Sequence, residues 1–429
     1  MKFKTITPVL TLSYSCFASD LPPLVLPQGV GVNIHFTRGH EQDLDLIAAA
    51  GFKFIRMDFG WAGIERTSGV YDWSAYDELT ANLEKRGLRA LYILDYSNPR
   101  YEETVVSKNP VTGREQKDTA SPQHPESVAA FARWAATAAK RYQGRRIVWE
   151  IWNEPNISFW KPKPNVEQYN ALALATCKAI READPNATIV APATSGFPWE
   201  FLEGFFKCGV LEYLDAVSVH PYRNYSKAPE SAAEDYQRLR GLIAHHAPSS
   251  AKRNMPILSG EWGYASHAKG VPLETQAAFI ARQQLANLLS GVPLSIWYDW
   301  KNDGADPNER EHNFGTMTHD LKPKPAYLVL QTLTRELSGC RIVRRLKVGS
   351  EHDFVLLLTN SAGAQKLAAW TTGESHVVAV DAGVSASNQV TAVRGSGEKF
   401  EPKIEQSRLQ IELTPLPAYF TIKGSNAVK

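Results

Sequence analysis

Two glutamates stand at the ends of short apolar runs, and a pair of carboxyl groups can do acid–base and nucleophilic chemistry. Glu154 follows the run 147–152, and Glu261 ends the run 256–261. Facing carboxyl groups can split a glycosidic bond, because one protonates the departing oxygen while the other attacks the anomeric carbon or activates a water. Direct attack needs carboxyl groups about 5–5.5 Å apart and the water route about 6.5–9.5 Å, a distance that sequence spacing does not fix.

The two runs belong to a series of eight, and segments of helical period separate them. The expected strands are residues 31–35, 52–57, 90–94, 147–152, 188–193, 216–220, 256–261 and 293–298. Continuous apolar runs suit strands buried on both faces, and helical crossovers require a parallel sheet. This order predicts an α/β fold, a (β/α)8 TIM barrel. An open doubly wound sheet would be favoured by a Gly-rich phosphate loop after the first strand, and Asn33 to Thr37 has no such composition.

Active sites of such barrels lie at the C-terminal ends of the strands. The polar and aromatic residues at those ends include His35, Arg56, Asp95, Asn153, Thr194, His220, Tyr222, Trp297 and Asp299. Arg56 is the natural cation to keep Glu261 ionised, and Tyr222 can donate its hydroxyl to the same group. Glu150 shares a strand face with Glu154, but at about 3.3 Å per residue it lies roughly 13 Å below the barrel mouth. We therefore do not expect Glu150 to be catalytic.

Several of these side chains also fit a purely structural role. Arg56 can instead form a structural ion pair with Asp58 or Glu150, and His35 or His220 can simply hold a loop. Three aspartates are equally good as hydrogen-bonding loop residues or as ligands: Asp95, Asp299 and Asp303.

Two other functions are compatible with a barrel of this kind. A non-catalytic carbohydrate-binding barrel would not need the Glu pair. A metal-dependent barrel hydrolase would need paired His on the first strand. With no His/Cys cluster of metal-ligand spacing in the sequence, we expect neither a metal nor another cofactor.

After Leu337 the sequence changes to short alternating runs separated by Gly, Ser, Asn or Asp, which predicts a small antiparallel β-sandwich. The expected strands are residues 341–348, 353–359, 365–371, 376–380, 390–393, 409–413 and 419–422. We therefore expect a barrel domain at 19–337 and an all-β sandwich domain at 338–429. The segment 21–27 is a further candidate strand of the second domain.

The composition gives no reason to expect a charged partner. The 429 residues include 47 Lys+Arg and 45 Asp+Glu, for a net charge of +2, without a run of like charges. We therefore expect neither nucleic acid nor an anionic membrane surface as a partner. Aromatic residues make up 10% of the chain, and aromatic faces suit neutral, C–H-rich ligands such as carbohydrates. A monomer is the default expectation.

Residues 1–18 have the character of a removable export signal. Lys2 and Lys4 precede a short apolar stretch at 6–12, and Ala18 is the small residue that a signal peptidase prefers. We therefore expect a secreted or periplasmic protein. No other stretch reaches the ~18 apolar residues of a membrane span.

The cysteines allow at most one disulfide in the chain that remains after residues 1–18 are removed. Cys177, Cys208 and Cys340 then stay, and Cys177 with Cys208 is the favoured pair because Cys340 lies far along the chain. Three buried thiols are the open alternative.

Two segments resemble the signatures of a known glycosidase family. Residues 148–160 read VWEIWNEPNISFW, which resembles the strand-four signature of glycoside hydrolase family 39. This family belongs to a large clan of retaining barrel glycosidases, and Asn-Glu-Pro is shared across that clan, cellulase family 5 included. Residues 257–263 read ILSGEWG and resemble the clan's nucleophile strand. They depart from the Thr-Glu-Tyr usual in family 39 β-xylosidases and are closer to its exopolysaccharide-degrading members and to family 5.

The resemblance covers residues 30–335 and implies a role for several residues. It implies that Glu154 is the general acid/base, that Glu261 is the nucleophile, and that Asn153 hydrogen-bonds the sugar 2-hydroxyl. It also implies that Trp297 forms the floor under the reacting sugar. His35 and His220 are expected to line the same subsite. Candidate platforms for neighbouring sugars are Trp160, Trp262 and Trp300.

The expected function is that of a retaining glycoside hydrolase that cleaves β-linked glycans, with β-xylosidase-like exo action favoured. An endo-acting exopolysaccharide or cellulase-like β-glycanase is the alternative. The connection 98–121 is 24 residues long, which is long for an ordered loop in a compact domain and indicates a function. It can either cap a pocket or line an open groove.

Overall fold

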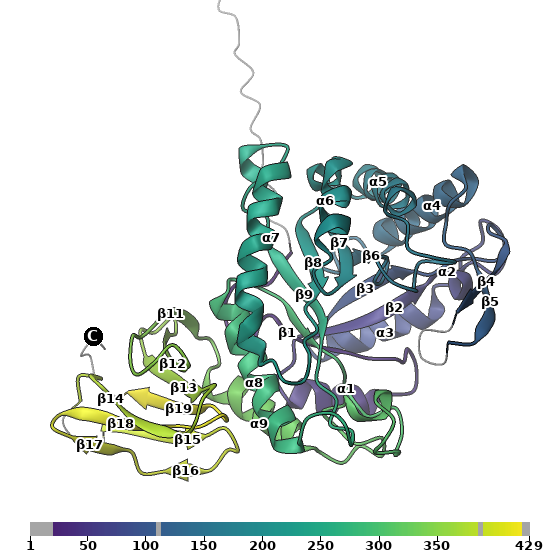
Figure 1. Ribbon diagram of the computed structural model, residues 1–429. Coiled ribbons are helices and arrows are strands. Elements are labelled where there is room, and N and C mark those ends of the chain that lie inside the picture. Colours follow the sequence, from purple (N-terminus) through teal and green to yellow (C-terminus); the bar gives the residue numbers. More distant parts are fainter. Residues whose placement is uncertain (1–19, 109–112, 385–388, 423–429) are drawn as a thin grey trace, which may run out of the picture.

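The computed structural model describes residues 20–108, 113–384 and 389–422. Within them, eight parallel strands close into a barrel in the order β1-β10-β9-β8-β7-β6-β3-β2 (Figure 1). The strands are β1 (Val30–Asn33), β2 (Phe54–Gly60), β3 (Arg89–Asp95), β6 (Val148–Ile151), β7 (Thr188–Ser195), β8 (Ala216–His220), β9 (Ile257–Trp262) and β10 (Ser295–Trp297). The predicted TIM barrel is confirmed, and each of the eight expected strands has a counterpart.

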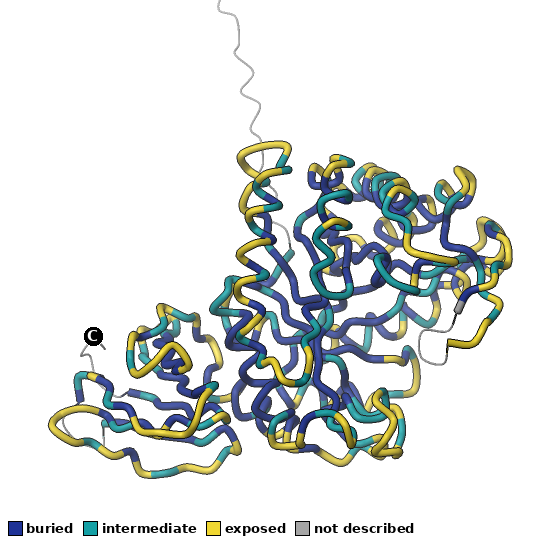
Figure 2. Tube along the Cα trace, viewed as in Figure 1, coloured by how far each residue is buried: buried dark blue, intermediate teal, exposed yellow. Residues whose placement is uncertain are grey.

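Helices surround the barrel on its outer side. They are α1 (Glu41–Ala49), α2 (Trp61–Ile64), α3 (Ser74–Lys85), α4 (Pro125–Arg141), α5 (Val166–Ala183), α6 (Trp199–Lys207), α7 (Ala232–His246), α8 (Leu273–Leu289) and α9 (Pro325–Glu336). The colouring in Figure 2 shows the strands buried and the helices exposed only on their outer faces, as expected for amphipathic helices that cover a parallel sheet.

Side chains alternate between two cores along each barrel strand. Residues inside the barrel form one apolar cluster, which includes Phe54, Val148, Leu258 and Ile296. The intervening residues point outward into the larger core under the helices. This period of two decides which strand-end residues face the barrel mouth and which face the helices.

The long connection 98–121 contains an element that we did not predict. It forms an antiparallel hairpin of β4 (Thr104–Lys108) and β5 (Glu115–Thr119) before α4 begins. Polar residues alternate along β5 without a buried face, so the sequence carried no strand signal there.

The C-terminal part forms two antiparallel sheets, which confirms the predicted all-β sandwich. One sheet has the order β11-β12-β13-β19-β15-β16 and the other β14-β18-β17. The strands are β11 (Arg341–Arg345), β12 (Asp353–Thr359), β13 (Gln365–Thr371), β14 (His376–Val380), β15 (Val390–Arg394), β16 (Lys399–Phe400), β17 (Lys403–Glu405), β18 (Arg408–Leu413) and β19 (Ala418–Ile422). The segment 21–27 adds no strand to these sheets: the amide of Leu26 donates to the carbonyl of Cys340, and that of Gly339 donates to Leu26.

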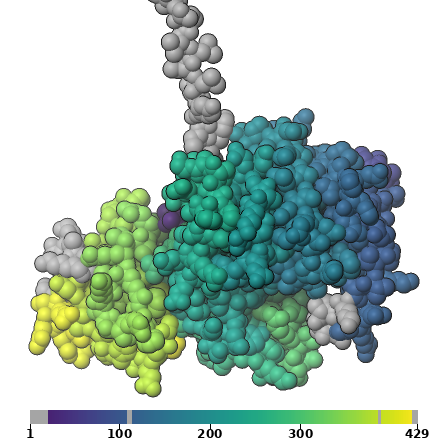
Figure 3. All heavy atoms as spheres, turned by 45° about the horizontal axis from the view of Figure 1, so that its top comes forward, coloured from purple at the N-terminus to yellow at the C-terminus, as the bar shows by residue number. Residues whose placement is uncertain are grey.

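The sandwich packs directly on the barrel (Figure 3). Trp370 of β13 is fully buried in the same core as the barrel helices, and its Nε1 donates to Oε1 of Glu230 at 2.7 Å. Glu230 also accepts two hydrogen bonds of 2.8 Å from Arg282 of α8. The Glu230 carboxylate therefore joins the sandwich to the barrel through its contact with Trp370, while Arg282 of the barrel holds it in position.

Three further expectations concern the chain outside the barrel mouth. The expected export signal at 1–18 lies outside the described residues. Cys177, Cys208 and Cys340 are free thiols, so the structure contains the three thiols rather than the favoured disulfide. None of the helices in the described ranges has the length and apolar character needed to cross a membrane.

Candidate active site

Arg56 of β2 is at the centre of the polar cluster in the barrel mouth and is buried. Its Nε donates to Glu150 at 2.7 Å, one terminal nitrogen donates to Glu261 at 2.6 Å and Asn33 at 3.3 Å, and the other donates to Asn153 at 2.8 Å. Burial opposes its charge, but Glu150 and Glu261 together raise the pKa of the guanidinium above its ordinary value. Arg56 therefore makes the alternative ion pair with Glu150 and the expected contact with Glu261 at once.

A β-bulge in β9 directs Glu261 into this cluster. Ser259 pairs with Ser295 while Trp262 pairs with Trp297, so β9 has one more residue than β10 between these two pairs. The extra residue turns the carboxylate toward the mouth, where the hydroxyl of Tyr222 donates to its Oε1 at 2.8 Å. Burial and then the charge of Glu261 raise the pKa of Tyr222 well above its usual value, so the hydroxyl keeps the proton that it donates.

Glu154 follows β6 where the backbone is strained. Trp152 and Glu154 have φ angles of 66° and 47°, in the left-handed region that costs residues other than glycine about 1–3 kcal/mol each. The amide of Glu154 donates to the carbonyl of Ala193 at 3.0 Å, which holds the turn in place. The side chain is buried, and its Oε1 lies 2.9 Å from Nδ1 of His220.

The two glutamates face each other at short range. One oxygen of Glu154, one nitrogen of His220 and one oxygen of Glu261 all lie within 4.8 Å of one another. An approach of single carboxylate oxygens to within 4.8 Å is compatible with the about 5–5.5 Å between two carboxyl groups that act by direct attack. The arrangement can therefore support nucleophilic attack and proton donation on opposite sides of one bond.

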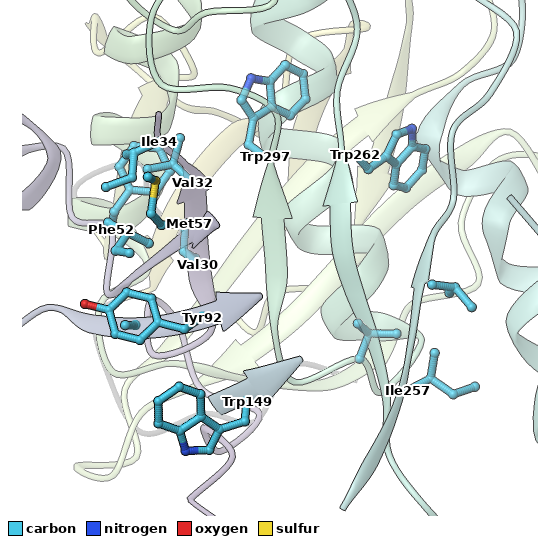
Figure 4. Close-up of a cluster of buried hydrophobic side chains, with 14 of the residues drawn as sticks. Val30, Val32, Ile34, Phe52, Met57, Tyr92, Trp149, Ile257, Trp262 and Trp297 are labelled. Carbon is cyan, nitrogen blue, oxygen red and sulfur yellow. The ribbon is translucent and has the colours of Figure 1, made fainter. Parts of the chain in front are cut away.

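The structure contradicts the expected role of the four tryptophans. Trp160, Trp262 and Trp297 are 0% exposed and Trp300 is 1% exposed, so none presents a face to a sugar. Figure 4 shows Trp262 and Trp297 in the buried apolar cluster. Trp297 packs beside Tyr264, because Ile296 before it points into the barrel. The nitrogens of Trp160 and Trp300 donate to Gln168 and Asp43 behind the site.

Tyr298 and Phe159 are two aromatic residues that, unlike the four tryptophans, are not buried, and sequence reasoning did not single out either of them as a site residue. Tyr298 is partly exposed and contacts His35 and Phe314 edge to face, with ring centroids 5.7 and 5.1 Å apart. Since Ile296 faces inward, alternation along the strand gives Tyr298 the same direction, and this signal was present in the sequence. Phe159 is 38% exposed and stacks on Tyr96, whose hydroxyl accepts a hydrogen bond from Asn153.

His35 lies beside Asp299 at the end of β10, with 3.5 Å between Nε2 and Oδ2. Asp299 is 1% exposed and its Oδ1 has no hydrogen-bond partner among the described residues. A small cavity of about 100 Å³ opens here, and Phe36 and Asp303 are among its lining residues. Burial raises the pKa of Asp299 to about 7, an effect that His35 opposes.

Asp95 ends β3 with 1% exposure and lies beside Asp58. Burial, then the charge of Asp58 and a hydrogen bond with it, raise the pKa of Asp95 well above its usual value. The structure therefore gives Asp95 an acidic partner at the edge of the cluster.

Among the residues that the structure describes, three groups of side chains have ligand atoms close enough to share a cation. They are Glu154, His220 and Glu261; His35, Asp299 and Asp303; and Glu102, Glu103 and His124. In the first group, Arg56 and Tyr222 already donate to Glu261, so its ligand set is engaged by protein donors.

The chain matches known glycoside hydrolases. A family model described as cellulase (glycosyl hydrolase family 5) matches residues 26–304, more than half of the chain. A β-xylosidase of Geobacillus stearothermophilus is 35% identical over 236 residues, which are 48% of this chain and 46% of that protein. A β-xylosidase of Caldicellulosiruptor saccharolyticus is 23% identical over 54% of this chain and 52% of its own length. The chain thus spans about half the length of these curated relatives.

A solved structure shares the fold over nearly the whole chain. It is a family 39 glycoside hydrolase from the gut symbiont Bacteroides cellulosilyticus, with a TM-score of 0.79 and 24% identity, and the match covers 94% of this chain and 82% of that one. At this identity the likeness concerns the fold. The chain belongs to the glycoside hydrolases that the cellulase model (glycosyl hydrolase family 5) describes, and its β-xylosidase relatives support the resemblance to family 39 of the same clan.

Proposed function

We propose that the chain is a retaining glycoside hydrolase that cleaves β-linked glycans by double displacement. The observation that carries the proposal is the approach of Glu154 and Glu261 to within 4.8 Å, each with different neighbours. Glu261 accepts hydrogen bonds from the guanidinium of Arg56 and the hydroxyl of Tyr222, whereas Glu154 lies buried against His220.

The reaction has two steps, and both carboxyl groups take part in each. In the first, Glu261 attacks the anomeric carbon while Glu154 gives its proton to the departing oxygen, so the glycosidic bond breaks as an ester to Glu261 forms. In the second, Glu154 takes a proton from water, the water attacks the anomeric carbon, and the ester bond breaks. Glu154 ends protonated and Glu261 ionised, as both began.

In the proposed mechanism, Asn153 holds the sugar 2-hydroxyl beside Glu154. Its Oδ1 accepts from Arg56 and its Nδ2 donates to Tyr96. An amide has two acceptor and two donor positions, so one of each stays available to a hydroxyl. A contact of this kind strengthens as the oxocarbenium-like transition state forms.

We propose β-xylosidase-like exo action as the specificity, supported by the names of the two curated relatives. Endo action on a β-glycan is the second candidate, and the match to the cellulase family model favours it. Product analysis separates the two. Exo action releases single sugars from the first minutes of xylan digestion, whereas endo action lowers the viscosity of the polymer before single sugars accumulate.

The location and assembly of the protein are further proposals. The character of residues 1–18 supports a secreted or periplasmic protein with a carbohydrate as its partner. N-terminal sequencing of the protein from the culture medium or periplasm tests this, since the chain would begin at or near Ser19 after removal of the signal. Light scattering tests the proposed monomer.

The decisive experiment replaces the nucleophile. Glu261→Gln keeps the size of the side chain but removes the charge, and we expect turnover of an aryl β-xyloside to be abolished. Glu203→Gln on α6 is the matched control, because the side chain of Glu203 is 46% exposed and pairs with Lys207 on the surface. Wild-type turnover by Glu261→Gln would refute the mechanism, and so would an inverted first product in proton NMR.

A further inference from the structure

The sandwich has a hollow of about 430 Å³ that lies far along the chain from the glutamates. One wall is formed by the end of β11 and the residues after it, and the other by the end of β14 and the start of β18. Its volume is within the about 300–1,000 Å³ of ligand sites in proteins. The lining residues, which we call the basic hollow, are Arg344, Arg345, Leu346, Lys347, Val348, Ala379, Val380, Asp381 and Arg408.

Four cations and one acid line the basic hollow. Arg345 donates to the backbone carbonyls of Glu351 and Asp353, and Arg408 donates to the carbonyl of Ala379. The acceptor of Arg408 carries no full charge, so this contact orients its guanidinium without neutralising it. Arg345 is held more firmly, because the charges of Asp353 and Glu230 act on it and its guanidinium lies 3.7 Å from the ring centroid of Phe354. Lys347 is exposed on the same wall. The near-zero charge of the whole chain therefore hides a local excess of positive charge.

An adjoining hollow of about 510 Å³ shares residues 345–348 with the first. It also contains Glu351 and Asp353, but Asp353 is already engaged by Ser350 and by His376. The positive side of this double hollow is thus the wall with Arg344 and Lys347.

Protection of a sheet edge explains only part of this charge. β11 is an edge strand, and charged residues on edge strands prevent pairing with other chains. Arg408, however, lies on β18, the central strand of the other sheet, and lines the same hollow. Cations from two sheets that meet over one cavity are the arrangement of an anion site rather than of edge protection.

The lining also limits the kind of anion. It contains no aromatic residue, so it offers no face on which a neutral sugar or an unpaired nucleotide base can stack. We propose that the basic hollow binds a polysaccharide that carries carboxylate groups, such as one with uronic acid units, and keeps it near the barrel. The choice of a glycan rests on the proposed function.

Binding to polygalacturonate tests the proposal with the full chain. Affinity electrophoresis and calorimetry compare the wild type with Arg344→Ala/Lys347→Ala in the presence of polygalacturonate, neutral xylan or duplex DNA. Lys399→Ala/Lys403→Ala is the matched control, because it removes the same charge from exposed positions of the same sandwich. Thermal melting of each variant checks that the fold is intact.

We expect the wild type and the control to bind polygalacturonate, and the Arg344/Lys347 variant to bind about tenfold more weakly. Binding should weaken as NaCl rises from about 50 to about 500 mM, since exposed charges are screened. Equal binding by all three proteins would overturn the proposal, as would the absence of binding or equal affinity for duplex DNA. The assay involves no turnover, so a protein that binds but hydrolyses no glycoside would refute only the proposed function.

Discussion

The Nδ1 nitrogen of His220 lies 2.9 Å from Oε1 of Glu154, and its Nε2 lies 3.3 Å from a terminal nitrogen of Arg56. A guanidinium can only donate hydrogen bonds, so Nε2 of His220 accepts and the ring proton is on Nδ1. His220 therefore donates to Oε1 of Glu154. In the proposed mechanism, Oε2 is then the oxygen of Glu154 that transfers the proton.

Glu154→Ala should separate the two steps of the reaction. A general acid contributes about 10²–10⁴ in rate, so turnover of a glycoside with a poor leaving group should fall by that factor. A dinitrophenyl glycoside, which needs no proton to leave, should still form the covalent ester. Azide should then restore turnover, because a small anion can attack the ester without a general base. An α-configured azide product, or no rescue, would contradict the assigned roles.

Arg56→Lys should damage both stability and activity. Lysine keeps the charge but loses the planar fork that contacts Glu150, Asn153 and Glu261 together. Each buried polar group left without its hydrogen bond costs about 1–3 kcal/mol of unfolding free energy, which urea denaturation can measure. Arg38→Lys is the control, since Arg38 pairs with Glu78 at the surface and should change stability by less than about 0.5 kcal/mol. A stable, active Arg56→Lys enzyme would contradict this view.

Two adjacent aromatic residues should behave differently on substitution. Trp297 is buried among apolar side chains, so Trp297→Phe should lower stability by about 1–3 kcal/mol and leave KM unchanged. Tyr298→Ala should raise KM or lower kcat with a smaller loss of stability, since Tyr298 is only partly buried beside His35. Steady-state kinetics and thermal melting measured on both variants test the pair. The reverse pattern would restore Trp297 as the sugar floor.

Asp299 should make the protein less stable as pH rises. Burial raises its pKa from 3.8 to about 7, so between about pH 4 and pH 7 the native protein holds more protons than the unfolded chain. The unfolding free energy therefore falls through this window. Burial tends to lower the pKa of His35, but Asp299 raises it overall, which adds a loss in the same direction.

Asp299→Asn should flatten this pH dependence, which denaturation with urea at several pH values can measure. Asp45→Asn is the control, because Asp45 is exposed and pairs with Arg86 on the surface. The same slope in the Asp299 variant and the wild type would show that another group is responsible.

The strand ends could be predicted from the sequence because apolar runs and helical periods recur eight times. The rule that barrel active sites lie at the C-terminal ends of the strands then selects Arg56, Asn153, His220 and Tyr222. The structure brings these residues together around the two glutamates. The platform tryptophans could not be predicted in the same way. Trp262 and Trp297 end β9 and β10, whereas Trp160 and Trp300 lie in the loops beyond β6 and β10. The directions of their side chains depend on the bulge in β9 and on the loop conformations.

Contacts between residues far apart in the chain could also not be predicted from the sequence. Asn33 accepts a hydrogen bond from Arg56 on the neighbouring strand. No sequence signal distinguishes Asn33 from other strand residues. Glu150 was excluded by its depth below the mouth, yet at that depth it supports Arg56 from beneath. Such supporting roles depend on which side chains stack in adjacent layers of the barrel, and this is set by register rather than by residue type.

Because Arg56 has five partners, we expect the active site to form late in folding. Its partners lie up to 205 residues away in sequence, so a growing chain emerges with this arginine long before Glu261 is synthesised. Until β9 joins the sheet, the guanidinium of Arg56 lacks the carboxylate of Glu261 as a partner, so we expect it to stay hydrated. Recovery of activity after dilution from denaturant should therefore coincide with the slowest, most non-local step of refolding.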